Sequence, residues 1–155
     1  MKGRPRSVER EVAAYLTQIL SDAGTPLVRI PVLGRTGPDI TWNEVKLIVD
    51  VKSRKACPLG LLAGPGEELF TDNGLIGIRL EDLRSVLKKP LQAGPVTPAS
   101  KTVTDWLNHM QEWTRANEPD GISAIILHRP RMPIGHATVI ISYSNRSTLC
   151  KRLML

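Results

Sequence analysis

The sequence predicts an α/β domain in which a central mixed β-sheet is flanked by helices. An amphipathic helix pattern opens the chain, three short β-type runs follow it, and a second amphipathic helix precedes two apolar strands. A chain of 155 residues is long enough to bury a mixed core without a disulfide or a structural metal. We therefore expect one domain over residues 1–155, without internal repeats.

The first helix is predicted from about Ser7 to Asp22, with Ser7 as its cap and with Gly24 and Pro26 after its end. Its apolar positions recur at helical spacing and are Val12, Tyr15, Leu16, Ile19 and Leu20. This spacing predicts that one face of the helix packs against the sheet.

Glu9 projects within about 20° of that apolar stripe, at about 100° of rotation per residue, whereas Glu11 points away from it. A carboxylate that faces the core needs a partner. A metal site is one explanation for Glu9, and a buried salt bridge to Arg10 or Arg29 is the alternative.

Three short β-type runs follow the helix and are separated by turn residues. The first break contains Gly34, Gly37 and Pro38, and the second contains Asn43 and Glu44. The predicted strands are Leu27–Val32, Ile40–Trp42 and Lys46–Lys52. The second turn folds the third strand back beside the second, so the chain begins as a helix and a meander.

Glycine, proline and scattered leucine dominate the segment from Cys57 to about Ser100. A turn or hairpin is predicted at Asp72–Gly74, and a short helix at Leu80–Lys89. We interpret residues 57–100 as an insertion in the domain.

A second clear helix, capped by Thr102 or Thr104, is predicted to end before Pro119 and Gly121. Its apolar stripe consists of Val103, Trp106, Leu107, Met110 and Trp113. This stripe should cover one sheet face, and its two tryptophans are more typical of core or dimer contacts than of base-stacking platforms.

Two apolar strands, Ile122–Leu127 and Ala137–Ser142, complete the predicted sheet. The proline-rich turn HRPRMPIGH joins them, and a final short helix is predicted from about Arg146 to the end. His109, His128 and His136 lack the spacing of metal ligands.

The charge balance favours a polyanionic partner. Lys and Arg outnumber Asp and Glu by 21 to 15, which gives a formal charge of +6 and a pI near 9.7. Nucleic acid is the first candidate, and a basic protein without such a partner is the alternative.

Cysteine usage and hydropathy predict a reducing, cytoplasmic setting without a membrane. The two cysteines, Cys57 and Cys150, are far apart and form no CxxC motif, which argues against a disulfide framework or a zinc module. The sequence shows no apolar run of membrane-spanning length and no signal-peptide core at its basic start.

Asp50 and Lys52 bring opposite charges into the apolar run LIVDVK. Successive side chains of a strand point to opposite faces, so these two share one face while Val49 and Val51 point to the other. Burial of such groups is costly unless they are paired or bind something. An ion pair satisfies this requirement, and so does an active site.

Asp39 precedes the second predicted strand, and the following turn can bring it towards Asp50. Two carboxylates there would supply the oxygen ligands that Mg²⁺ and Mn²⁺ prefer. Such ions promote phosphodiester hydrolysis because they lower the pKa of a bound water and stabilise charge on the phosphate. Lys52 is well placed to orient that water or to stabilise the transition state.

The pattern Pro38-Asp39 followed by Asp50-Val51-Lys52 resembles the PD-(D/E)xK nuclease superfamily. The longer strings SVERE, VRIPVLG, GPDI and IVDVKSRK resemble the archaeal and phage type of Holliday junction resolvase. The resemblance covers about residues 2–55 well and the later helix and strand pair loosely. It implies a restriction-endonuclease-like core.

The resemblance also implies functional roles. Asp39 and Asp50 would ligate the metal, the Val51 carbonyl would complete its shell, Glu9 would contribute directly or through water, and Lys52 would be catalytic. The second acid of the family is more often Glu, so Asp50 shortens the reach by one methylene group. A homodimer follows from paired incisions across a two-fold junction.

Basic residues near the motif are expected to hold the DNA backbone without reading bases. They are Arg4, Arg6, Arg10, Arg35, Arg54 and Lys55. Solvated surface charge is the alternative for any single one.

The sequence thus predicts a Mg²⁺-dependent DNA endonuclease acting on branched DNA in recombination or repair, with Mn²⁺ as a substitute. Two alternatives remain. One is a restriction or repair endonuclease that uses the same site on duplex or flap DNA, and the other is a binding module without catalytic activity.

Overall fold

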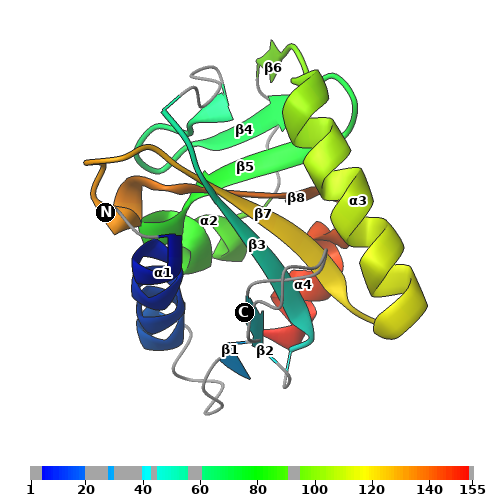
Figure 1. Cartoon of the computed structure of the whole chain (residues 1–155). Coiled ribbons are helices and arrows are strands. Elements are labelled where there is room, and N and C mark those ends of the chain that lie inside the picture. The colour runs from blue at the N-terminus through cyan, green and yellow to red at the C-terminus, as the bar shows by residue number, and fades with distance from the viewer. Residues whose placement is uncertain are drawn as a thin grey trace.

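The computed structural model describes residues 5–19, 28–29, 40–42, 45–55, 61–90 and 95–153. In these residues one mixed sheet has the strand order β1-β2-β3-β7-β8-β5-β4-β6. The strands are β1 (Val28–Arg29), β2 (Ile40–Trp42), β3 (Leu47–Ser53), β4 (Glu68–Thr71), β5 (Leu75–Arg79), β6 (Val96–Thr97), β7 (Ile122–His128) and β8 (Thr138–Ser142). Helices flank the sheet, which confirms the predicted α/β class (Figure 1).

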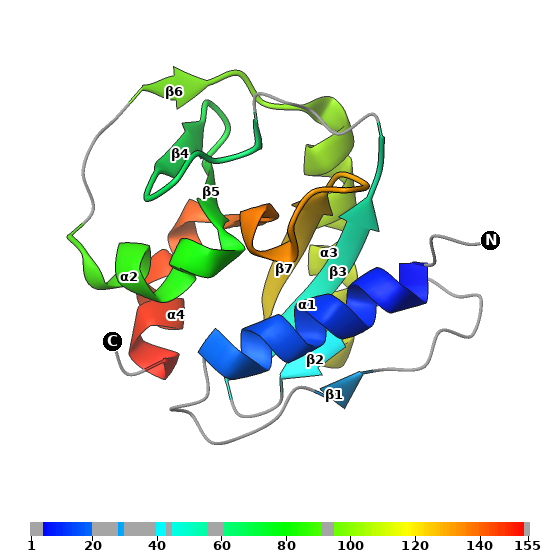
Figure 2. The same ribbon diagram turned by 90° about the vertical axis from the view of Figure 1, so that its left-hand side faces the viewer.

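The helices are α1 (Pro5–Ile19), α2 (Leu83–Lys88), α3 (Lys101–Asn117) and α4 (Arg146–Arg152). Helix α3 lies on one face of the sheet, and α1, α2 and α4 lie on the other (Figures 1 and 2). None of the helices in the described ranges combines the length and apolarity needed to cross a bilayer.

The sheet has an antiparallel meander at one end and a parallel pair next to it. Strand β2 pairs antiparallel with β3, and Ile40 lies opposite Val49. Strand β3 pairs parallel with β7 over its full length, from Leu47 opposite Ile122 to Ser53 opposite His128. The carboxyl ends of β3 and β7 therefore meet at the same edge of the sheet.

The segment interpreted as an insertion supplies the strands β4, β5 and β6 to this same sheet, and it also contains α2. The predicted turn at residues 72–74 joins β4 and β5, with Gly74 at φ 85° and its N–H donating to the Thr71 carbonyl at 3.3 Å. The predicted helix Leu80–Lys89 begins as a 3₁₀ turn and becomes α-helical only over Leu83–Lys88.

Two parts of the fold repeat one order of elements, although the sequence shows no repeat. Strand β5, a 3₁₀ turn and α2 are matched by β8, a 3₁₀ turn and α4. The two strands are antiparallel neighbours, with Gly77 opposite Ile140. A Cβ atom on Gly77 would lie 3.0 Å from the Ile140 side chain, so glycine allows the close approach of these strands.

Side-chain alternation along β3 and β7 divides the core between the two faces. Leu47 and Val49 of β3 pack with α1, α2 and α4, together with Ala124 and Ile126 of β7. Ile48 of β3 belongs instead to the core beneath α3. We call these two sides of the sheet the α1 face and the α3 face.

Two predicted caps are wrong. Helix α1 begins at Pro5, so Ser7 lies inside its first turn, where proline is tolerated because its missing N–H has no helical acceptor there. Helix α3 is capped by Ser100, whose hydroxyl accepts from the Val103 N–H at 3.2 Å, and not by Thr102 or Thr104.

Candidate functional site

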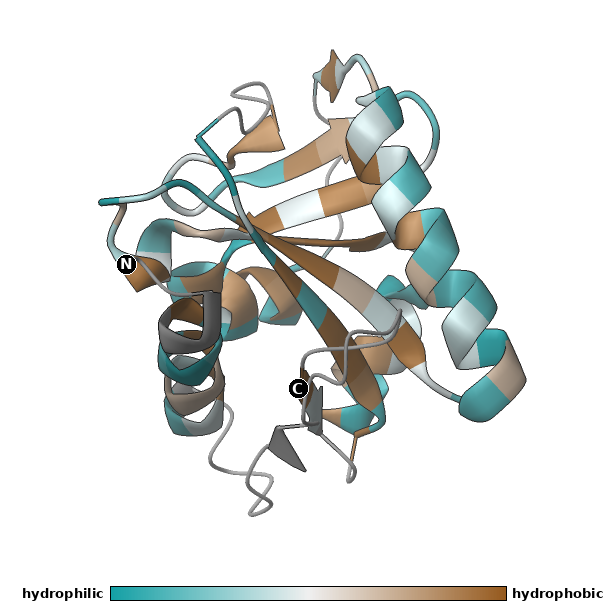
Figure 3. Cartoon of the chain, in the orientation of Figure 1, coloured by the Kyte–Doolittle hydropathy of each residue, from teal (hydrophilic) through white to brown (hydrophobic). Residues whose placement is uncertain are grey.

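Strand β3 changes character halfway along its length. Its first three residues, Leu47–Val49, are buried, and the next four, Asp50–Ser53, are half-buried. The chain beyond β3 and the chain beyond β7 become hydrophilic as they leave the sheet (Figure 3). The polar part of β3 therefore lies at the sheet edge where both strands end.

Asp50 and Lys52 lie side by side in this polar part. The Lys52 Nζ is 3.1 Å from the Asp50 Oδ2, and the two side chains are 21% and 14% exposed, respectively. Alternation along the strand places both on the α3 face. The predicted juxtaposition of carboxylate and ammonium is thus present, and solvent still reaches both groups.

Trp106 of α3 completes this arrangement. The Lys52 Nζ lies 5.3 Å and the Arg54 guanidinium carbon 5.9 Å from the centroid of the Trp106 ring. Both distances are within the range of cation–π attraction. The indole also packs, partly buried, against the core beneath α3, as does Trp113. Trp106 therefore joins the apolar core to the two cations.

Asp39 lies outside the described residues. It directly precedes β2, whose first residue, Ile40, pairs with Val49, the residue before Asp50. Within the described ranges, no group of three or more His, Cys, Asp or Glu side chains could hold a metal ion. Of the predicted metal ligands that the structure describes, Asp50 is the one whose carboxylate lies on the α3 face.

Glu9 is buried, with 5% of its surface exposed, and Glu11 is exposed, as the helical spacing predicted. Glu9 belongs to α1, whose Val12 and Leu16 pack on the face that carries Leu47 and Val49. The helix carrying Glu9 and the Asp50–Lys52 pair therefore lie on opposite faces of the sheet. The side chains of Asp50 and Lys52 face α3 and not α1.

Val51 packs, partly buried, against the core of the α1 face. Its side chain therefore points away from Asp50 and Lys52, in agreement with the predicted alternation. Its carbonyl remains a predicted ligand.

The predicted DNA-binding residues are described in part. Arg10, Arg54 and Lys55 are exposed. Arg6 lies in α1, and its side chain is outside the described part, as are Arg4 and Arg35.

A buried histidine at the carboxyl end of β7 was not predicted as a site residue. His128 is 4% exposed, its Nδ1 lies 2.9 Å from the Ser53 hydroxyl, and its Nε2 lies 2.9 Å from the Met132 carbonyl. A carbonyl oxygen only accepts, so Nε2 is the donor, and in the neutral ring Nδ1 accepts from Ser53. The signal in the sequence was a histidine that ends an apolar strand and begins a proline-rich turn.

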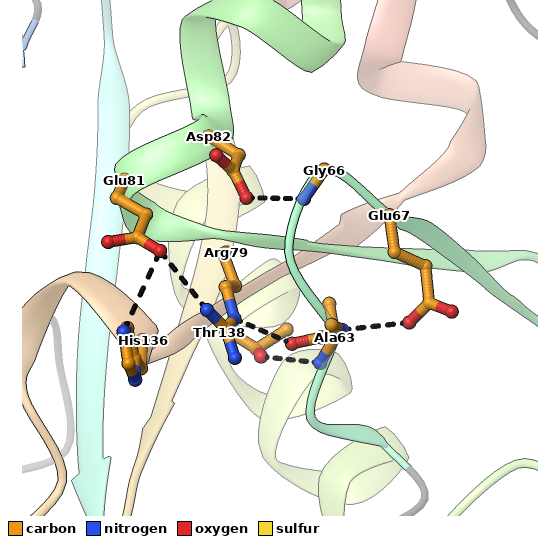
Figure 4. A network of polar contacts seen from close by, with 9 residues as sticks. Ala63, Gly66, Glu67, Arg79, Glu81, Asp82, His136 and Thr138 are labelled. Carbon is orange, nitrogen blue, oxygen red and sulfur yellow. Dashed lines mark hydrogen bonds and ion pairs between the residues drawn. The ribbon is translucent and has the colours of Figure 1, made fainter.

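A second polar cluster joins the segment before β4 to the ends of β5 and β8 (Figure 4). Arg79 donates to the Ala63 carbonyl at 3.1 Å and to Glu81 at 3.1 Å, and His136 lies 3.7 Å from Glu81. The Ala63 N–H donates to the Thr138 hydroxyl at 2.9 Å. Because its contacts go to backbone groups and to one another, this cluster holds a loop on the sheet.

Tyr15 of α1 lies next to the same cluster. A Cβ atom on Gly135 would lie 2.7 Å from the Tyr15 hydroxyl and 2.9 Å from the Glu81 carboxylate. Burial, followed by the charges of Glu81 and Asp82, raises the pKa of Tyr15. Tyr15 therefore stays neutral and can donate a hydrogen bond here.

A scan of family models, a search of curated proteins and a search of solved structures each found no match for this chain.

Proposed function

We propose that the protein is a metal-dependent DNA endonuclease with a PD-(D/E)xK site on a restriction-endonuclease-like core. The observation that carries the proposal is the Asp50–Lys52 pair, 3.1 Å apart and half-buried at the carboxyl end of a sheet strand. Branched DNA is the proposed substrate, on the resemblance of residues 2–55 to Holliday junction resolvases. The proposed assembly is a homodimer.

The chemistry of the described donors fits a divalent cation. Asp50 offers a hard carboxylate oxygen, the ligand type that Mg²⁺ and Mn²⁺ prefer. We propose that Asp39 is the second carboxylate, because β2 begins directly after it and pairs with β3 next to Asp50. The Val51 carbonyl remains a proposed ligand on the strength of the resemblance alone. Because α1 carries Glu9 across the sheet from Asp50, we propose that Glu9 contributes through water.

When bound, a divalent cation supplies Lewis-acid activation of water and neutralises charge on the scissile phosphate. The protein groups position the reactants. The carboxylate oxygen of Asp50, which would bind the ion, is held in place by strand β3. Lys52 presents an ammonium that can orient the attacking water or donate to a phosphate oxygen. Trp106 keeps the ammonium on the α3 face.

Metal-dependent cleavage by the wild-type chain tests the proposal. A four-way junction, a matched linear duplex and a flap substrate should be incubated with Mg²⁺ and with Mn²⁺. We expect cleavage of the junction, and expect Asp50→Ala to abolish it while DNA binding is retained. Asp105→Ala is the matched control, because Asp105 is also an acid paired with a lysine but is 58% exposed on α3.

The other outcomes separate the alternatives. Faster cleavage of the duplex or the flap would indicate a restriction or repair endonuclease. A wild-type chain that binds DNA but cuts none of the three substrates with either ion would refute the enzyme and leave a binding module. Sedimentation of the chain with and without the junction tests the proposed homodimer.

A further inference from the structure

The turn that follows β7 carries two exposed arginines, Arg129 and Arg131. Within the described part of the chain, neither guanidinium makes an ion pair or a hydrogen bond. Because both side chains are exposed and lack an acidic partner there, neither packing nor an ion pair accounts for an arginine at these positions. Both lie in the segment directly after β7, which is hydrophilic where it leaves the sheet (Figure 3).

The parallel register brings these arginines to the cations that follow β3. Ser53 pairs with His128, and the next residue, Arg54, donates its N–H to the His128 carbonyl at 2.9 Å. Neighbouring strands lie about 4.8 Å apart, so the chain segments carrying Arg54 and Arg129 start as neighbours. With Lys55 and Arg131, four exposed cations therefore crowd at one edge of the sheet.

Polar contacts of the half-buried Met132 and the buried His128 hold the turn against β3. The Met132 N–H donates to the Arg129 carbonyl at 3.0 Å, and the Met132 carbonyl accepts from the buried His128. His128 is in turn bonded to Ser53 of β3. The position of the turn is thus tied to the strand that carries Asp50 and Lys52.

Arg131 adopts a backbone conformation that disfavours most side chains. Its φ is 73°, in the left-handed region, which glycine and asparagine tolerate better than arginine. Residues held in this way persist only where surrounding contacts fix them, and they cluster at functional sites. The contacts of Met132 supply that fixation.

We infer that the Arg129–Met132 turn is a second phosphate-binding element of the proposed nuclease and that His128 is the residue that positions it. Like charges gathered at one edge repel one another unless a polyanion lies between them. The His128 and Ser53 side chains lie on the α1 face, whereas Arg54 stacks on Trp106 on the α3 face. A DNA backbone that lies along this sheet edge would therefore contact the cations that follow β3 and those that follow β7.

The inference rests on the proposed function for its ligand, but its test does not depend on cleavage. Binding of a labelled four-way junction and of a linear duplex should be measured in EDTA over a range of salt concentrations. The variant is Arg129→Gln with Arg131→Asn, since asparagine suits the left-handed backbone. Arg115→Gln with Lys151→Gln removes the same charge from exposed positions on α3 and α4 and is the control.

We expect the slope of log affinity against log salt to fall in magnitude by about 2 in the Arg129/Arg131 variant, since each phosphate contact contributes roughly 0.9. The control pair should retain a slope within a few tenths of wild type. An unchanged slope in the first variant, or an equal loss in the control, would refute the inference. Absence of cleavage by the wild type would refute only the nuclease.

A double-mutant cycle tests the positioning role of His128. His128→Asn should weaken DNA binding in the wild-type background and have no further effect when Arg129 and Arg131 have already been replaced. Equal losses in both backgrounds would show that His128 acts through general stability, and would refute the positioning role. Ser53→Ala, which removes only the Nδ1 bond, provides a milder variant if His128→Asn does not fold.

Discussion

Two ion pairs in this molecule are built from the same kinds of group and differ in how completely they are satisfied. Arg146 of α4 donates from Nε to Glu68 Oε2 at 2.5 Å and from its second nitrogen to Glu68 Oε1 at 2.9 Å, and it also reaches the Val86 and Lys89 carbonyls at 3.2 Å. Its side chain is 10% exposed and that of Glu68 is 11% exposed. The Lys52–Asp50 pair has one contact of 3.1 Å and greater exposure.

The difference separates a structural pair from a candidate site. Arg146 joins β4, α2 and α4, and its hydrogen bond to Glu68 raises its pKa, so the guanidinium stays charged at any pH at which the protein is handled. In this bidentate pair both carboxylate oxygens and two of the guanidinium nitrogens are already engaged. Lys52 has donors left over, and Asp50 has a second oxygen, at a sheet edge reached by solvent. The less satisfied pair is therefore the one suited to chemistry.

The largest expected effect is on activity at the half-buried Asp50–Lys52 pair. Asp50→Asn and Lys52→Met should each lower kcat by about 10³-fold or more, because the metal ligand or the ammonium is lost, while the free energy of unfolding changes by less than about 1 kcal/mol. Steady-state cleavage at saturating substrate and urea unfolding of the same preparations measure the two quantities. A variant that loses several kcal/mol of stability would place Asp50–Lys52 with the structural pair.

The next effect is on stability at the buried pair. Arg146→Ala leaves the Glu68 carboxylate buried without a partner, and we expect a loss of about 3–5 kcal/mol in the free energy of unfolding. Cleavage per folded molecule should change less than about threefold when measured well below the transition temperature. Urea titration with parallel activity measurement tests this. If activity collapsed while stability held, Arg146 would belong to the site.

A smaller effect on the free energy of unfolding separates the cost of burying the Glu68 and Arg146 charges from the gain of pairing them. Glu68→Leu with Arg146→Met replaces both charges by apolar groups, and we expect the double variant to recover about 1–3 kcal/mol relative to the sum of the single losses. The matched cycle on Asp50 and Lys52 should give a coupling free energy below about 1 kcal/mol, since solvent screens that pair. Coupling free energies of equal size in the two cycles would show that the two pairs contribute alike to stability.

The same contrast shows what the sequence could and could not predict. The polar half of β3 was predictable within one residue, because alternation in an apolar strand is a local signal. The Glu68–Arg146 pair joins residues 78 positions apart and depends on β5 pairing with β8, which no local pattern specifies. The same pairing brings the presumed insertion into the sheet.

The candidate site follows the same rule. The contact of Lys52 with Asp50 is local and was predicted. Its contact with Trp106 depends on which sheet face α3 covers, and His128 depends on the parallel register with Ser53. Periodicity showed that Glu9 faces inward, but it carried no information about which side of β3 the helix would occupy. Local charge placement was therefore predictable, and the partners supplied by distant elements were not.

The smallest expected effect concerns the aromatic partner that the buried pair lacks. A cation over an indole at a partly exposed site is worth about 0.5–1 kcal/mol, so Trp106→Leu should lower kcat by roughly two- to fivefold by freeing Lys52 from its position beside Asp50. Trp106→Phe keeps a ring face and should restore most of that loss, although both variants shrink the side chain that packs on the core. Trp113→Leu is the control, because Trp113 packs on the same core from the same helix. If the Leu variants at 106 and 113 lowered kcat equally, Trp106 would act only by packing, and Lys52 would be held beside Asp50 by that ion pair alone.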